Sequence, residues 1–256
     1  EILVGNVFEP DQAEVSPDDF ERLIAEAEHN LNAKWSEPLH LSGVPHGGLQ
    51  LIGAPDSLLD AAEAEHVDLL VVGTRGTGHL AGLHLGSMAH HLAHLTRGPL
   101  AIVPSAGATA TIDRIVVGVD GSAGSESAVS WCAGLAAACN ADVIAICAFE
   151  PHPRWGSSDR DVATRRAAVE AAVSSVWVAP LRDAGVTFRT RVVEGKHPGA
   201  ALASAATDEG AGLLVVGTRG LNDVVGSRLA RMPLQLVHHT HLPVILIPPN
   251  PMVDAP

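Results

Sequence analysis

The chain has 256 residues, of which 46% are hydrophobic, enough for one large or two small domains with a buried core. Its formal net charge is −13, so it lacks the basic surface with which proteins bind nucleic acids or anionic membranes. No apolar run approaches the roughly 18 residues of a membrane-spanning helix. We therefore expect no nucleic-acid or membrane partner. Three cysteines are too few for a disulfide framework and favour the cytoplasm.

The chain repeats itself. LLVVGTRG occurs at Leu69–Gly76 and again at Leu213–Gly220, 144 residues later, and His94–Pro104 aligns without a gap with His238–Pro248. Identical segments at one spacing indicate two copies of one structural unit. We expect a first domain over residues 1–106, a linker over 107–111 and a second domain over 112–256.

The first copy alternates strand and helix patterns. A helix start is marked by Ser16, with Pro17 and two carboxylates directly after it. Two further helices are predicted at Asp56–His66 and Ser87–Leu95. Apolar runs predict strands at Ile2–Phe8, Leu49–Ile52, Leu69–Val72 and Leu100–Val103.

The second copy shows the whole unit. Predicted strands are Ile115–Val119, Val143–Phe149, Phe188–Val193, Leu213–Val216 and Val244–Ile247. Predicted helices are Ser125–Cys139, Asp161–Trp177, Gly199–Glu209 and Arg228–His239. This alternation predicts an α/β fold of two tandem flavodoxin-like (Rossmann-like) domains with parallel five-stranded sheets. The cysteines Cys132, Cys139 and Cys147 fall at apolar positions and are interpreted as small core residues.

The first strand and helix of the second copy have no counterpart in the first. VFEP at Val7–Pro10 matches AFEP at Ala148–Pro151, which would place that counterpart before Glu1. In a sheet of flavodoxin-like order, about 2-1-3-4-5, the first strand is interior. We therefore expect a further βα unit before Glu1 in the natural protein.

A glycine motif follows the fourth strand of the unit. In the first copy it runs from Gly73 to Ser87 as G-x2-G-x9-G-S and leads into a predicted helix. Glycines let the backbone approach a ligand closely, and successive amides form a nest for an anion. The free amides and positive dipole end of the helix that follows suit a phosphate.

This motif, inside a tandem βα series, resembles the ATP-binding branch of the universal stress protein (UspA-like) family. IVVGVDGS at Ile115–Ser122 is similar to the family's opening strand. The resemblance implies a cytoplasmic, nucleotide-dependent stress-response regulator that binds ATP, with or without Mg²⁺. It also implies self-association through the terminal strands PLAIVP and PVILIPP, which would join the two domains or pair two chains.

The resemblance implies site residues one by one. It implies that Gly73, Gly76, Gly86 and Ser87, flanked by Thr74 and Met88, hold the phosphates and ribose. It also implies that Val7 lines the adenine pocket. In the second copy Asp120 faces the base, or holds a metal, and Gly217 and Gly220 repeat the loop glycines. Arg75 is either a phosphate contact or a solvated arginine.

The second copy departs from the motif at the helix start. Ala230 and Arg231 stand where the first copy has Gly86 and Ser87, and we expect Pro233 to displace the start of the helix. A Cβ and a bulky side chain would then lie on the phosphate path. We expect this copy to bind nucleotide weakly or not at all, with Arg231 as the alternative phosphate ligand.

Other chemistry has weaker support. The chain has fourteen histidines, and His90 and His94 lie four residues apart. No carboxylate or cysteine is spaced to complete a metal site with this pair. The histidines are therefore interpreted as solvated, and no metal site is predicted. The chain has no G-x4-G-K-[ST] motif, and neither of its two lysines lies beside a glycine loop. We assign no catalytic residue. A slow ATPase, a cAMP-binding protein and a ligand-free scaffold remain alternatives.

Overall fold

A computed structural model describes residues 1–8, 16–74, 85–104, 111–150, 159–220 and 231–249. The chain forms two compact units, Glu1–Val67 and Asp68–Pro256. Within the described residues, no helix is long and apolar enough to cross a bilayer.

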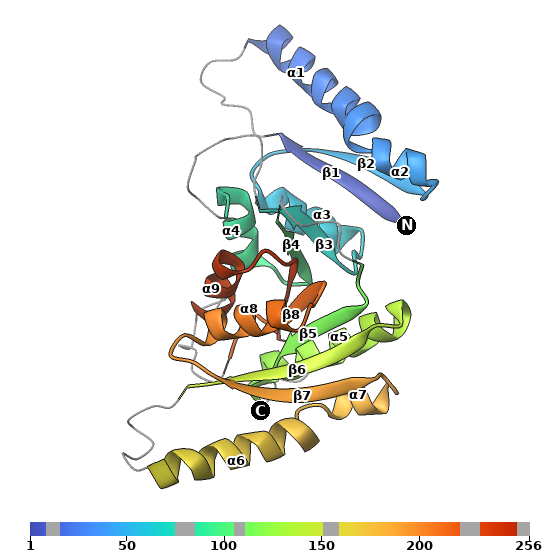
Figure 1. Ribbon diagram of the computed structural model, residues 1–256. Coiled ribbons are helices and arrows are strands. Elements are labelled where there is room, and N and C mark those ends of the chain that lie inside the picture. Colours follow the sequence, from blue (N-terminus) through green and yellow to red (C-terminus); the bar gives the residue numbers. More distant parts are fainter. Residues whose placement is uncertain (9–15, 75–84, 105–110, 151–158, 221–230, 250–256) are drawn as a thin grey trace. The chain divides into compact units, whose positions relative to one another are not determined.

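The first unit is a two-stranded parallel sheet with helices. Strand β1 (Ile2–Phe8) pairs with β2 (His46–Ile52) in a register that sets Ile2 beside His46 and Phe8 beside Ile52. Figure 1 shows these two strands in blue, with α3 following β2 along the chain. The helical segments are α1 (Pro17–Asn30), the π-helical turn η1 (Leu31–Trp35), α2 (Glu37–Ser42) and α3 (Asp56–Ala64).

The predicted start of α1 is confirmed. Ser16 is its N-cap, and its hydroxyl oxygen accepts a hydrogen bond from the Asp19 amide at 3.2 Å. Segments η1 and α2 were not predicted. At the π-helical turn, the amide and hydroxyl of Ser36 both donate to the carbonyl of Leu31, at 3.1 and 2.7 Å.

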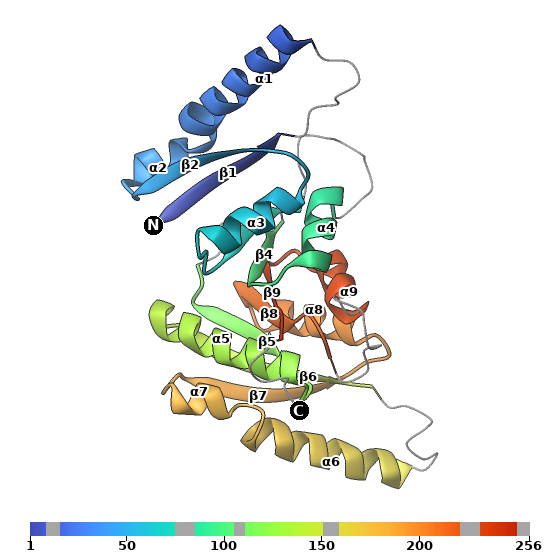
Figure 2. The same ribbon diagram turned by 180° about the vertical axis from the view of Figure 1, so that it is seen from behind.

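The second unit is built on one seven-stranded sheet, in the order β3-β4-β9-β8-β5-β6-β7. Its strands are β3 (Leu70–Gly73), β4 (Leu100–Val103), β5 (Arg114–Gly118), β6 (Asp142–Phe149), β7 (Phe188–Glu194), β8 (Leu213–Gly217) and β9 (Val244–Ile247). Its helices are α4 (Ser87–Leu95), α5 (Ala123–Cys139), α6 (Asp159–Ser175), α7 (Ala179–Asp183), α8 (Pro198–Asp208) and α9 (Arg231–His239). Figure 2 shows the same elements from behind.

The strand order corrects one expectation. Numbered within the second copy, β7-β6-β5-β8-β9 is the order 3-2-1-4-5, so the expected 2-1-3-4-5 is wrong. The third strand pairs with the second and takes the sheet edge, while the chain crosses over through α8 to the far side of the first strand. The first strand, β5, is still interior, between β6 and β8.

The terminal strands of the two copies pair with each other. Strands β4 and β9 run antiparallel, with Leu100 beside Leu246 and Ile102 beside Val244. The second unit therefore holds one mixed sheet and not two separate parallel ones. Both strands are short and apolar, and pairing satisfies the backbone groups that each would otherwise leave at an open edge. Pairing between two chains stays a prediction.

Helices cover both faces of the second copy's strands. One face carries Ile115, Val117 and Val215, packed in a core with residues of α5, α6 and α7. On the other face, Leu202 of α8 lies close to Gly118. Near-continuous apolar strands reflect burial on both faces.

Two of the three cysteines belong to this core. Cys132 and Cys147 are buried, as expected, and burial raises the pKa of both thiols to about 12, with the charge of Asp120 adding to the effect at Cys147. Both therefore stay protonated and unreactive near neutral pH. The expectation is wrong for Cys139, which is exposed at the last turn of α5.

An ion-pair cluster joins the edge strand β7 to the end of α8. Glu209, the C-cap of α8, pairs with Arg189 and with Arg191, whose Nη1 lies 2.9 Å from Glu209 Oε1. Arg114 donates to the backbone carbonyl of Glu209 at 2.6 Å. The hydrogen bond from Arg189, with that from Arg191, lowers the pKa of the Glu209 carboxyl.

We predict that Glu209→Gln lowers the free energy of unfolding near neutral pH by about 1 kcal/mol, because it removes a charge shared by two arginines that are themselves exposed. A carboxyl whose folded pKa is lowered stabilises the fold above its unfolded pKa, near 4.5. The difference between wild type and variant should therefore shrink as the pH falls below that value and through the folded pKa. Urea unfolding across this range measures it.

The matched control is Asp183→Asn, an exposed carboxylate on α7. It removes a carboxylate at an exposed position and should change the free energy of unfolding near neutral pH by less than about 0.5 kcal/mol. A Glu209→Gln protein that stays less stable by a constant amount at every pH would contradict the ionic origin of the effect.

Candidate functional site

The two ends of the glycine motif meet in the first copy. Beyond β3, the Thr74 amide donates to the Val103 carbonyl at 2.9 Å, which extends the pairing with β4 by one residue. The Gly86 amide then donates to the Thr74 carbonyl at 2.7 Å. The second bond therefore brings together Thr74 and Gly86, which are twelve positions apart in the sequence. Arg75 and Gly76 lie outside the described residues.

Helix α4 begins where the loop closes, as predicted. Gly86 is its N-cap, in extended conformation with φ −71° and ψ 160°, and provides no side-chain cap to the first turn. Ser87 is exposed and Met88 is 38% exposed, while Leu85 and Ala89 are buried. The first-turn amides and the positive dipole end of a helix are the groups that bind phosphates at helix N-termini.

The repeated glycine of the second copy serves packing. Gly217 ends β8 and is buried, and a Cβ built on it would lie 2.6 Å from both the carbonyl carbon and the oxygen of Gly124. A Cβ on Gly124 would in turn clash with the carbonyl oxygen of Arg219. The first turn of α5 thus lies directly against the end of β8, at a distance that only two glycines permit. Gly73, at the matching position of the first copy, is exposed.

Sequence reasoning missed Gly124. It lies in the first turn of a helix that is otherwise rich in alanine and other small residues, at a position where a glycine costs stability unless a close backbone approach requires it. That mismatch between residue and helix was the available signal.

Asp120 lies in the turn that leads from β5 to α5. Its Oδ1 accepts hydrogen bonds from the Ser122 amide at 2.9 Å and from the Ser122 hydroxyl at 2.6 Å. Ser122 is the N-cap of α5, and its Oγ lies 3.4 Å from the carbonyl oxygen of Arg219. The carboxylate therefore orders the turn beside the second glycine loop. Its role toward a base or a metal stays a prediction.

The described part of α9 bears on a second expectation. Residues 231–239 are helical, so Pro233 does not delay the helix beyond Arg231, the position that matches Ser87 at the start of α4. Ala230 lies outside the described residues. Gly220, the last described residue of the second loop, is half-buried.

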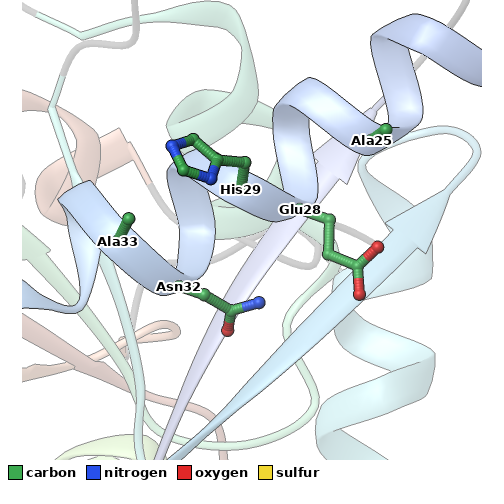
Figure 3. Close-up of a pocket in the computed structure, with 5 residues that line it drawn as sticks. All are labelled: Ala25, Glu28, His29, Asn32 and Ala33. Atoms are coloured by element: carbon green, nitrogen blue, oxygen red, sulfur yellow. The ribbon is translucent and has the colours of Figure 1, made fainter.

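Val7 lies in the other compact unit, half-buried on β1 and paired with Leu51. That unit also carries a shallow hollow of about 450 Å³ along α1 and η1. Figure 3 shows its lining residues along one helical stretch, Ala25, Glu28, His29, Asn32 and Ala33.

Comparison with known proteins decides the family. The model of the universal stress protein family matches residues 2–104 and 111–248. The chain belongs to the universal stress protein family. Two successive matches agree with the internal repeat, and the family accounts for the α/β fold.

Two relatives each match part of the chain. A universal stress protein of Mycobacterium bovis is 29% identical over 204 residues, which are 75% of this chain and 63% of that protein. This chain therefore spans less than two thirds of the length of that relative. A universal stress protein of Thermus aquaticus is 32% identical over 104 residues, 40% of this chain and 76% of that protein.

Solved universal stress protein structures share the fold. The crystal structure of one from Archaeoglobus fulgidus has a TM-score of 0.68 at 15% identity, covering 98% of this chain and 88% of that one. A putative universal stress protein from Pseudomonas aeruginosa has a TM-score of 0.64 at 17% identity, covering 98% and 94%.

The two copies of the glycine give a matched pair of variants. We predict that Gly217→Ala costs several kcal/mol of unfolding free energy, because its Cβ would meet the backbone of Gly124 and force the strand and helix apart. Gly73→Ala, at the exposed copy, should cost about 1 kcal/mol or less. Thermal or urea unfolding of both variants measures the difference. Equal losses would contradict a packing role for Gly217.

Proposed function

We propose that the first copy binds ATP and that the protein acts as a nucleotide-dependent regulator of the stress response in the cytoplasm. The observation that carries the proposal is the hydrogen bond from the Gly86 amide to the Thr74 carbonyl at the start of α4. It brings Gly86, near the end of the G-x2-G-x9-G-S motif, beside the residue that follows Gly73, the first glycine of the motif. The family supports the same reading, since its ATP-binding branch carries this motif.

Each motif residue has a task in this proposal. The amides of Ser87 and Met88 at the start of α4 bind phosphate oxygens, and the Ser87 hydroxyl adds a donor. Gly73, Gly76 and Gly86 let the backbone approach the nucleotide, with Thr74 and Arg75 beside them. Mg²⁺, when bound with ATP, neutralises part of the phosphate charge.

The second copy binds nucleotide weakly or not at all in this proposal. Arg231 of α9 stands at the position where the first copy offers the small Ser87. The Asp120 carboxylate already accepts two hydrogen bonds from Ser122. Gly217 is held against α5 and is buried.

We predict that Gly86→Asp lowers ATP affinity at least a hundredfold, measured by isothermal titration calorimetry. Aspartate is a favoured N-cap at the φ and ψ of Gly86, so the fold should survive, while its charge repels the phosphates. Gly86→Asn caps the helix without charge and should lose much less affinity. Ala230→Asp, at the matching position of the second copy, should leave affinity unchanged.

Unchanged ATP binding by Gly86→Asp would place the site elsewhere. Three alternatives have their own readouts. Competition by cAMP at a concentration comparable to ATP would indicate a cyclic-nucleotide protein. Phosphate release that rises with Mg²⁺ and is lost in Asp120→Ala would indicate a slow ATPase. No heat with any adenine nucleotide would indicate a ligand-free scaffold.

We further propose that a βα unit equivalent to β5 and α5 completes the first copy, which we place at residues 1–106 beside a second domain at 112–256. Val71 and Val215 occupy matching positions in the identical LLVVG segments. Val71 pairs with Ala101, Ala101 with Ile245, and Ile245 with Val215. Residues paired in this way across a sheet lie on one face, so Val71 and Val215 share a face. Val215 is fully buried between β5, β9 and α5, whereas Val71 is 57% exposed. Within the described residues β3 pairs only with β4. A strand and helix beside β3 would bury Val71.

Fusion of residues 112–141 ahead of the chain tests this completion. We predict that amide hydrogen exchange in Leu70–Gly73 slows at least tenfold, because the open edge of β3 gains a parallel partner. The control fusion carries Val116→Ser and Val117→Ser, which weaken the added strand. Identical exchange in both fusions and in the unfused chain would contradict the proposal.

A further inference from the structure

Two histidines lie one turn apart on α4. The ring centroids of His90 and His94 are 4.6 Å apart, and the ring planes are tilted by 55°. Two imidazoles bound to one metal through bonds of about 2.0–2.1 Å place their ring centroids roughly 4.5 to 5.2 Å apart. The separation in α4 already falls within this range. Sequence spacing alone could not establish it, since rotamers decide whether such a pair converges.

Helix α4 holds the pair in place. Leu92 and Ala93 on the same helix are fully or almost fully buried, and the His90 amide donates to the Gly86 carbonyl at 3.0 Å. His90 is exposed and His94 is half-buried, so a metal can reach the pair from solvent.

We propose that His90 and His94 form a two-imidazole chelate for a divalent transition metal, of the Cu²⁺, Ni²⁺ or Zn²⁺ class. Imidazole nitrogens suit these ions, whereas Mg²⁺ and Ca²⁺ prefer oxygen ligands. Among the described residues no group of three or more His, Cys, Asp or Glu side chains is placed to hold a metal. In this proposal the two imidazoles are the protein ligands, and water occupies the other coordination positions.

The second copy contains a natural control. His238 on α9 matches His94, but Leu234 stands at the position that matches His90. The second copy keeps one of the two ligands and cannot form the chelate. A bidentate site binds a metal more tightly than either imidazole alone. Once one imidazole has bound the metal, the second is held next to it at a high effective concentration.

The test is a calorimetric titration of the full chain with Ni²⁺, and then with Cu²⁺. We expect one equivalent bound more tightly than the background from the other histidines. His90→Gln and His94→Gln should each weaken that equivalent at least tenfold, while His238→Gln leaves it unchanged. Cu²⁺ should bind more tightly than Ni²⁺ at the same site.

A second measurement keeps the result independent of folding defects. Ni²⁺ should raise the melting temperature of the wild type and of His238→Gln, because a ligand that binds only the folded helix stabilises the fold. Ni²⁺ should not raise the melting temperature of His90→Gln. Residue 90 is exposed, so this substitution should leave the fold intact. ATP affinity of His90→Gln should match wild type, so failure here is separate from failure of the nucleotide site. Equal Ni²⁺ affinity in all four proteins would overturn the proposal, as would an equal loss in His238→Gln.

Discussion

A strand inside a parallel sheet must be paired along both edges and covered on both faces, and this constraint organises the whole second unit. Strand β8 meets it: β5 and β9 pair with its edges, and α5 packs on one face. Strand β3 has the same sequence and pairs with β4, yet Val71 is 57% exposed. Surroundings, not local sequence, decide burial. The antiparallel pairing of β4 with β9 follows from the same need, because it closes the free edge of both copies at once.

The glycine motif has different surroundings in the two copies. In the second copy Gly217 and Gly124 allow β8 and α5 to touch through backbone atoms, so the glycine is needed for packing whether or not a ligand binds. In the first copy Gly73 is exposed, and the Gly86 amide donates to the Thr74 carbonyl. A glycine motif is therefore weak support for a binding site until its surroundings are known. Helix α4 begins with Gly86 and the exposed Ser87, whereas Arg231 stands at the position of Ser87 in α9.

Local features of the fold could be predicted from the sequence. The bounds of α4, β1, β4 and β9 were predicted to the residue, because apolar periodicity and turn residues mark both of their ends. Features that depend on distant partners could not. The antiparallel β4–β9 pairing and the edge position of β7 leave no mark in a single segment, and η1 is too short for a periodic pattern. At the site, motif spacing indicated that Gly73 and Gly86 belong together, but the role of Gly124 and the ring geometry of His90 and His94 needed coordinates.

In the proposed complex, main-chain amides at the start of α4 bind the phosphates of ATP. Amide NMR of the full chain during titration with ATP tests this directly. We predict saturable shifts at the amides of Thr74, Gly86, Ser87 and Met88, with little change at Gly217, Thr218 and Arg231. Shifts confined to the second copy, or no saturable shift in either, would contradict it.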